Sequence, residues 1–313
     1  MRILVIGAGA VGGYFGARLA QAGRDVTFLM RGKRLEQVRK DGLQIVSPFG
    51  DATVHVKAIS AQEIDGPYDL IFLSVKSYAL TGAMEDFAPA VGPDSMILPV
   101  LNGMQHMHAL EKRFGARPLL GGVAQIASEL DDKGRIVQLA QMQTVTYGER
   151  NGETTARVQQ LDEAMRNAGF EAKLSTHIMD DMWRKWVQLA TLGAMNSLLD
   201  ASVGEIVSAP GGREVALAIL GESLAVAKAS GYPQAEDFLA RLSTILADKD
   251  SKLTSSMYRD MKSGAPVEAD TILGDFLHYA EKGAVAAPLL RAAYVKLSIY
   301  QASREKTAKR AAS

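Results

Sequence analysis

A glycine-rich turn directly after the first apolar run of the chain constrains its fold more than any other feature. Residues 3–6 predict a strand, and the segment "GAGAVGG" that follows carries Gly7, Gly9 and Gly12 into a helical pattern. Gly7 allows a tight turn, and Gly12 lets the helix pack closely against the strand. Because a strand, turn and helix of this kind form the first half of a βαβ unit, we expect an α/β domain at the start of the chain.

The same turn predicts a binding site for a dinucleotide. Gly9 lets the backbone approach a pyrophosphate, and the N-terminus of the helix, with Ala10 and Val11, faces the anion. A βα turn that is merely tight is the alternative, because a GxGxxG match alone is a weak signal. The position of the turn between a strand and a helix favours the dinucleotide.

An arginine stands where the second predicted strand, residues 26–30, ends. In many dinucleotide sites an Asp or Glu about 20 residues after the glycines binds a ribose hydroxyl, and the sequence offers no such acid here. Arg31 would suit a 2′-phosphate, which an acid would repel. A solvated charge at a strand end is the alternative, since Lys33 and Arg34 follow. The missing acid favours NADPH over NADH as the cofactor.

Alternating apolar runs and helical patterns organise the first half of the chain. Strands are predicted at residues 3–6, 26–30, 70–75, 96–101 and 119–126, with helices at 12–22, 78–90 and 105–114 between most of them. This rhythm predicts a parallel sheet with helices on both faces. A looser β pattern covers residues 135–149, and a further helix is predicted at 155–168.

From His177 onward the patterns are long and helical, with breaks at residues 210–212, 231–233, 263–266 and 288. At 313 residues the chain is also long for a single hydrophobic core. We therefore expect an α/β Rossmann-type NADP-binding domain over residues 1–173 and an all-α substrate domain over residues 174–313.

Composition narrows the class of partner. The chain has 35 basic and 35 acidic side chains, so it offers no basic field for nucleic acid or for an anionic membrane, and a small molecule is the expected partner. It has no cysteine, which excludes disulfides, thiolate metal sites and cysteine nucleophiles and fits a reducing cytoplasm. The first 20 residues are similar to a secretion signal, but their glycines and Arg18 fit a strand, turn and helix better. We expect a cytoplasmic protein.

A metal site is not expected. His106 and His108 are two residues apart and would not share a helical face. His177 with Asp180 or Asp181 is the one pair that would suit a lactate-type dehydrogenase, which uses a histidine beside a carboxylate, and it stays as a minor alternative.

A second group of residues lies in the segment "DDMWRKWVQLATLGAMNSLLD", residues 180–200. On a helix, Lys185 shares a face with Asp181 and with apolar residues, so it could be a surface lysine paired with Asp181. Alternatively, its ammonium could point into an active site, where it would stabilise the alkoxide formed from a ketone and donate a proton to it. The helix alone does not decide between them.

Five motifs, in order, resemble those of the ketopantoate reductases, also called 2-dehydropantoate 2-reductases. They are the glycine turn with Arg31, "LSVKSY" at 73–78, "LNGM" at 101–104, "WRKW" at 183–186 and "SSMYRDMKSGAPVEAD" at 255–270. The resemblance covers nearly the whole chain. It implies NADPH-dependent reduction of ketopantoate to pantoate, for pantothenate and coenzyme A biosynthesis, by a Rossmann domain and a helical domain with the active site between them.

The resemblance also implies roles for single residues. Lys185 would be the general acid, and Glu268 would orient the substrate and the lysine. Asn102 would lie near the nicotinamide and the reacting carbonyl, Lys76 beside the cofactor, and Ser256 against the substrate. Each has an alternative: Asn102 begins a common turn pair, Ser255 and Ser256 could cap a helix, and Glu268 could complement a helix dipole.

The resemblance fails at two positions. The family has asparagines four and eight residues after the catalytic lysine, and this chain has Leu189 and Gly193 there, while Asn196 comes three residues too late. The substrate could therefore be another, more apolar 2-oxo acid. A non-catalytic NADPH-binding regulator is a further alternative, which the joint presence of lysine, glutamate, serine and asparagine disfavours. The apolar C-terminal helices could also bury a homodimer interface.

Overall fold

The computed structural model describes residues 1–312 and divides into two compact units. The N-terminal unit comprises Met1–Leu101 and His106–Asp181. The C-terminal unit comprises Asn102–Gln105 and the chain from Met182 onward. The short segment Asn102–Gln105 therefore belongs with the C-terminal helices, although the chain on both sides of it belongs to the N-terminal unit.

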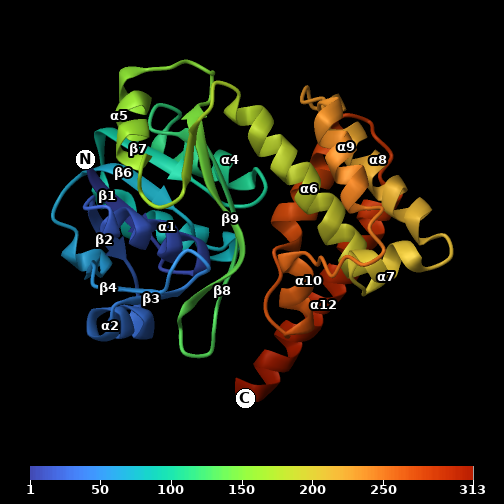
Figure 1. The fold of residues 1–313 in the computed structure, drawn as a ribbon, viewed down its shortest axis with the longest axis horizontal. Helices are drawn as coiled ribbons and strands as arrows, with labels where there is room; N and C mark the ends of the chain where they lie inside the picture. The colour runs from blue at the N-terminus through green and yellow to red at the C-terminus, as the bar shows by residue number, and fades with distance from the viewer. Residues whose placement is uncertain (313) are drawn as a thin grey trace. The chain divides into compact units, whose positions relative to one another are not determined.

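A five-stranded parallel sheet forms the centre of the N-terminal unit (Figure 1), in the order β5-β2-β1-β6-β7. Its strands are β1 (Arg2–Ile6), β2 (Asp25–Leu29), β5 (Lys57–Ile59), β6 (Tyr68–Leu73) and β7 (Val91–Pro99). Consecutive residues of a strand point to opposite faces, yet Ile3, Leu4 and Val5 are all fully buried. Both faces of the sheet are thus covered, which confirms the predicted Rossmann-type architecture.

The helices of this unit follow the strands closely. They are α1 (Ala10–Gln21), α2 (Gly32–Asp41), α3 (Leu80–Phe87), α4 (Gln105–Phe114) and α5 (Ala156–Met165), with short 3₁₀ turns η1 (Ala61–Glu63), η2 (Ser77–Ala79) and η3 (Ala88–Ala90). Four of the five helices had been predicted from the sequence pattern. The charged helix α2, directly after Arg31, had not.

The strand predicted at residues 119–126 does not continue the parallel sheet, and on this point the prediction was wrong. One parallel bridge, from Ile97 to Leu119, links the segment to β7. The strand β8 (Leu120–Leu130) then pairs antiparallel with β9 (Ile136–Glu149), because the connection between them is a short turn, which suits a hairpin, and has no crossover helix. With β3 (Leu43–Val46), β4 (Ala52–Val54) and β10 (Glu171–Leu174), this hairpin builds a second sheet in the order β10-β9-β3-β4.

Helices are the only regular elements among the described residues of the C-terminal unit, which confirms an all-α part. They are α6 (Ile178–Leu199), α7 (Val203–Ser208), α8 (Gly212–Ala229), α9 (Glu236–Ile245), α10 (Ser256–Lys262), the π-helical turn η4 (Asp270–Gly274), α11 (Asp275–Lys282) and α12 (Pro288–Ala312). The predicted breaks fall between these helices, and Pro288 is the first residue of α12, where proline is favoured.

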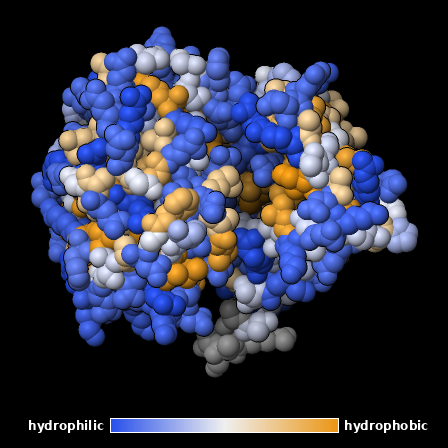
Figure 2. Space-filling view, in the orientation of Figure 1, coloured by the Kyte–Doolittle hydropathy of each residue, from blue (hydrophilic) through white to orange (hydrophobic). Residues whose placement is uncertain are grey.

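Aromatic side chains fix α6 against α11. Trp183 and Trp186 are buried, and the ring of Trp186 lies 4.8 Å from that of Phe276 in an edge-to-face arrangement. The Trp183 ring meets that of Tyr279 in the same way at 5.2 Å. Hydrophilic residues cover most of the face shown in Figure 2. Within residues 1–312, no helix is both long and apolar enough to cross a membrane.

Candidate active site

The glycine turn between β1 and α1 has the geometry that the sequence predicts. Gly7 has φ +90°, which favours glycine, and a Cβ at Gly12 would overlap the Ser74 hydroxyl and lie 2.6 Å from the Gly7 carbonyl oxygen. At Gly9, by contrast, a Cβ would meet no atom of the described chain within 4 Å. The chain thus leaves no room for a side chain at Gly12, whereas the space beside Gly9 is free. Free space at Gly9 fits the approach of a pyrophosphate.

The N-terminus of α1 faces the same place. Gly9 is the residue that precedes the helix, and Ala10, Val11 and Gly12 form the start of its first turn. The N–H groups of a first turn have no partners inside the helix and favour an anion. The start of α1 therefore suits an anion such as a pyrophosphate.

Three of the predicted cofactor contacts come from one edge of the parallel sheet. Gly7 follows β1, Arg31 lies just after β2, and Lys76 lies shortly after β6. Since β1 pairs in parallel with both β2 and β6, these segments leave the sheet at the same edge. Ligands of open α/β sheets bind at the carboxyl ends of the strands, so the arrangement suits one bound molecule.

Arg31 has partners that the sequence did not reveal. Its guanidinium forms an ion pair with Asp86 of α3 and donates a hydrogen bond to the Gly82 carbonyl at 2.6 Å. The side chain is nevertheless 62% exposed, which leaves it accessible to a phosphate. An acid therefore does lie at the end of β2, but it comes from a helix 55 residues further along the chain.

The C-terminal unit brings Lys185 and Glu268 together. Lys185 lies on α6 between the buried Trp183 and Trp186, and the indole N–H of Trp186 donates to the Ile272 carbonyl at 3.0 Å. The Glu268 carbonyl in turn accepts from the Ile272 N–H at 3.0 Å. The π-helical turn η4 is thus bonded to α6 next to the lysine and to the segment that carries the glutamate.

The electrostatics of the two side chains show that they act on each other. Burial of the Lys185 ammonium lowers its pKa to about 8, and the charge of the buried Glu268 opposes this effect by raising it. Asp181, the other acid considered for Lys185, accepts a hydrogen bond from the Ser175 hydroxyl at 2.6 Å. A lysine with a pKa near neutrality can hold a proton and also release it, which suits a general acid.

The segment that carries Asn102 comes from a different part of the chain and lies against η4. The residue after it, Gly103, has φ +75°, and a Cβ there would overlap the Thr271 carbonyl. Gly103 therefore packs directly on η4, and Asn102 is its neighbour in the chain. Turns of π-helical type occur frequently at functional sites, and this one lies against segments that carry three of the predicted site residues.

Hydrogen bonds of Ser255 fix the start of α10, where Ser256 lies. Ser256 is the first residue of α10, and the Ser255 hydroxyl before it accepts from the Tyr258 N–H at 3.1 Å, which confirms that a serine caps this helix. The Ser255 N–H donates to the side chain of Asn196 at 2.9 Å, and the Asn196 amide donates to the Ala201 carbonyl at 2.9 Å. Asn196 thus anchors α10 to α6, a role that its sequence position did not suggest.

Leu189 and Gly193 stand at the positions where the family has asparagines, and Gly193 has an apolar neighbour. A Cβ at Gly193 would lie 2.6 Å from the methyl group of Met257, which is 2% exposed. Leu189 lies one turn closer to Lys185 on the same helical face. At these two positions α6 therefore presents leucine and glycine, and Met257 of α10 packs on the glycine.

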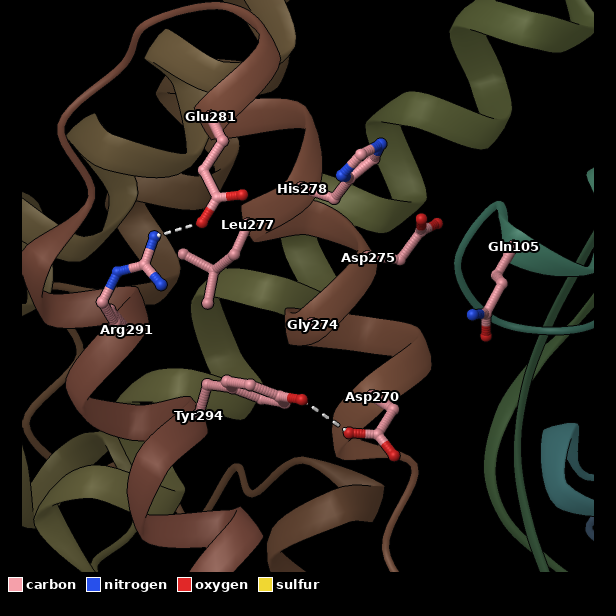
Figure 3. Close-up of a pocket in the computed structure, with 9 residues that line it drawn as sticks. All are labelled: Gln105, Asp270, Gly274, Asp275, Leu277, His278, Glu281, Arg291 and Tyr294. Carbon is pink, nitrogen blue, oxygen red and sulfur yellow. Dashed lines mark hydrogen bonds and ion pairs between the residues drawn. The ribbon is translucent and has the colours of Figure 1, made fainter.

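A separate surface pocket of about 390 Å³ lies beside η4 (Figure 3). Tyr294 donates to Asp270 across it at 2.8 Å, and Arg291 forms an ion pair with Glu281 at 2.9 Å. The residues that line it, all within the described chain, do not include Lys185, Ser256 or Glu268. The described residues also contain no cluster of His, Asp and Glu able to hold a metal ion.

Comparisons with known proteins agree with this arrangement. Residues 3–152 match the family model described as ketopantoate reductase PanE/ApbA, and residues 177–301 match the model of its C-terminal domain. The chain is 36% identical to the uncharacterized oxidoreductase YkpB of Bacillus subtilis, over 97% of this chain and 100% of that protein.

Two solved structures show the same fold. The crystal structure of 2-dehydropantoate 2-reductase from Geobacter metallireducens aligns with a TM-score of 0.87 at 30% identity and covers 95% of this chain and 99% of that one. D-mandelate dehydrogenase with NADH and anilino(oxo)acetate aligns with a TM-score of 0.86 at 22% identity, over 97% of this chain and 100% of that one. The two matched domains, with the 36% identity to YkpB and the 30% identity to the Geobacter metallireducens structure, show that the chain belongs to the ketopantoate reductase family of NAD(P)-dependent oxidoreductases.

Proposed function

We propose that this protein is a 2-dehydropantoate 2-reductase, which uses NADPH to reduce ketopantoate to pantoate in pantothenate and coenzyme A biosynthesis. The observation that carries the proposal is the electrostatic interaction of Lys185 with Glu268 in the C-terminal unit. Burial lowers the pKa of the lysine to about 8, and the glutamate opposes that effect. A group of this kind can donate a proton at neutral pH.

Lys185 has two tasks in this reaction. Its ammonium hydrogen-bonds to the ketone oxygen, stabilises the negative charge that develops there, and transfers a proton to that oxygen. A reduced nicotinamide, when bound, supplies the hydride that the carbonyl carbon accepts. Glu268 keeps the lysine protonated at neutral pH and orients it. Asn102 and Ser256 hold the substrate.

The N-terminal unit would hold the cofactor. The backbone of the turn from Gly7 to Gly12, including Ala10 and Val11, would bind the pyrophosphate, and Lys76 would lie beside the cofactor. Arg31 would bind the 2′-phosphate that distinguishes NADPH from NADH, because its guanidinium is exposed next to the end of β2. Asn102 would contact the nicotinamide as well as the substrate.

A second candidate substrate is a more apolar 2-oxo acid. Leu189, Gly193 and Met257 support it, because they place apolar atoms beyond Lys185 where the family has amide side chains. Ketopantoate carries a hydroxymethyl group, and an apolar surface offers that group no hydrogen bond. A substrate with an alkyl or aryl group in its place would suit this surface better.

The two candidates are separated by measuring NADPH consumption with ketopantoate and with 2-oxo acids that carry isopropyl, isobutyl or phenyl groups. The highest kcat/KM with ketopantoate supports the first candidate, and the highest kcat/KM with an alkyl or aryl acid supports the second. The Lys185→Ala variant should lose activity by roughly 100- to 10,000-fold with every substrate. Lys228→Ala, which changes an exposed lysine on α8, should keep the wild-type activity. If NADPH binds and no substrate is turned over, the protein is instead an NADPH-binding regulator.

A further inference from the structure

The hairpin of β8 and β9 ends in a turn that is held by its own hydrogen bonds. One oxygen of the Asp131 carboxylate accepts from the N–H groups of Lys133 and Arg135, at 3.0 and 2.8 Å. The Arg135 side chain donates to the other oxygen at 2.7 Å, and this bond is the main reason why the pKa of Asp131 is lowered. Gly134 adopts φ +74°, so the turn has a defined shape.

Helix α2 binds this turn through two side chains. Arg34 donates from Nη1 to the Gly134 carbonyl at 2.8 Å, and Gln37 donates to the Lys133 carbonyl at 2.7 Å. A Cβ at Gly134 would lie 2.7 Å from the Gln37 side-chain oxygen, so the two elements are in close contact. Figure 1 likewise shows the end of the hairpin beside α2.

Arg34 also binds the glycine turn. Its Nε donates to the Ala8 carbonyl at 3.1 Å, and Ala8 lies between Gly7 and Gly9. One planar guanidinium therefore connects the backbone of the glycine turn to the backbone of the hairpin turn, a geometry that the rigid fork of arginine donors permits and a lysine does not. Burial lowers the pKa of Arg34, but the group remains charged.

Two other residues join the hairpin to the start of α1. The hydroxyl of Ser128, on β8, donates to the Ala10 carbonyl at 3.1 Å. On β9, the side chain of Ile136 packs on Gly13, where a Cβ would lie 2.6 Å from its Cδ1 atom. The hairpin thus contacts the glycine turn and the first turn of α1 independently of Arg34.

We propose that Arg34 and Ser128 are positioning residues for the dinucleotide, acting through the carbonyl groups of Ala8 and Ala10. The inference rests on the proposed dinucleotide site. A loop that is already ordered in its binding conformation loses less entropy when a ligand binds. Because the two residues hold the backbone that faces the pyrophosphate, and NADPH and NADH share this group, both nucleotides depend on them to the same degree.

The test compares Arg34→Met with a matched variant of the same helix, Arg39→Met. Arg39 also donates to a backbone carbonyl, that of Ala58 on β5 at 3.0 Å, and pairs with Glu63, but it does not bond to the glycine turn. Calorimetric titration of the proteins without substrate should show NADPH and NADH each bound roughly tenfold more weakly by Arg34→Met. Arg39→Met should bind both as the wild type does. Arg34→Lys should lie between Arg34→Met and the wild type.

Hydrogen exchange of the protein without nucleotide supplies a readout that is independent of ligand. In Arg34→Met, the amides of residues 8–13 and 131–135 should both exchange faster than in the wild type, while those of β6 stay unchanged. Ser128→Ala should weaken the binding of both nucleotides in the same way. It tests the proposal independently if Arg34→Met fails to fold. In both variants, KM for NADPH should rise while kcat at saturating NADPH stays near the wild-type value.

Several outcomes would overturn the inference. If Arg34→Met and Ser128→Ala bind both nucleotides as the wild type does, or if Arg39→Met loses as much affinity as Arg34→Met, the two residues do not position the turn. If Arg34→Met weakened the binding of NADPH and not that of NADH, Arg34 would contact the 2′-phosphate directly. If the wild type binds neither nucleotide, the proposed function itself fails.

Discussion

Burial and Glu268 act on Lys185 in opposite directions, and the result is a lysine whose pKa is about 8. A general acid must carry its proton when the substrate binds, so the protonated lysine is the active form in the direction of reduction. We expect kcat/KM for the 2-oxo acid to be constant below this pKa and to fall as the pH rises through about 8. A profile measured with saturating NADPH checks this. If the fall occurred only near pH 10, an ordinary solvated lysine would be indicated.

Removing the charge of Glu268 should move the same profile. In Glu268→Gln the side chain keeps its size but no longer raises the pKa of Lys185, so the fall in kcat/KM should shift to lower pH. Asp181→Asn is the matched control, because Asp181 lies one turn before the lysine on the same helical face. If the pH profile shifted with Asp181→Asn and not with Glu268→Gln, Asp181 would be the acid that raises the pKa of Lys185.

Loss of the lysine itself should affect catalysis and not cofactor binding. Lys185→Ala should lower kcat by roughly 100- to 10,000-fold, the range for a lost general acid. Affinity for NADPH should barely change, because the glycine turn and Arg31 belong to the N-terminal unit and Lys185 to the C-terminal unit. Rapid-mixing kinetics together with a binding titration would measure both quantities.

Glu268→Ala should raise KM as well as lower kcat, if the glutamate orients both the substrate and Lys185. The double variant with Lys185→Ala should then be less impaired than the product of the two single losses, since residues that act as a unit are not additive. Steady-state kinetics of the four proteins tests this. Strict additivity would show that the two residues work independently.

Two glycines of the turn should respond differently to alanine. Gly12→Ala places a methyl group against the Ser74 hydroxyl and the Gly7 backbone, so both thermal stability and nucleotide binding should fall. Gly9→Ala meets no described atom within 4 Å, so the melting temperature should stay close to that of the wild type. Its methyl group would nevertheless occupy the space of the pyrophosphate and weaken binding. If Gly9→Ala binds NADPH normally, the anion lies elsewhere.

Patterns that are local in sequence predicted much of this molecule. The strands β1, β2, β6 and β7 and the helices α1, α3 and α4 follow from apolar periodicity and from glycine, which act over a few residues, whereas the charged helix α2 does not. The partner of a strand is not local information. Residues 119–126 were recognised as a strand, but their antiparallel pairing with β9 depends on a turn whose shape is set by bonds to Asp131.

The candidate site shows the same limit. Lys185 and Glu268 were predicted by resemblance, whereas η4, which joins their segments, has no sequence signal that we can identify. Asn196 was three residues away from the expected position, and only the structure shows that it binds the N–H of Ser255. Arg34, which looks like a solvated charge beside Arg31, bonds to a carbonyl 26 residues earlier in the chain and to one 100 residues later.

Asp86 adds a final prediction about cofactor choice, because it pairs with the guanidinium that is expected to bind the 2′-phosphate. Arg31→Ala should weaken NADPH roughly ten- to a hundredfold and NADH far less, since a charge-assisted contact is lost only with the former. Asp86→Asn removes a negative charge beside that phosphate and releases Arg31 from an exposed ion pair. The variant should therefore bind NADPH about two- to fivefold more tightly and bind NADH with unchanged affinity. Lys33→Ala, at an exposed position two residues after Arg31, is the control. Titrations of all three variants with both nucleotides decide the matter, and equal losses of NADPH and NADH in Arg31→Ala would remove Arg31 from the cofactor site.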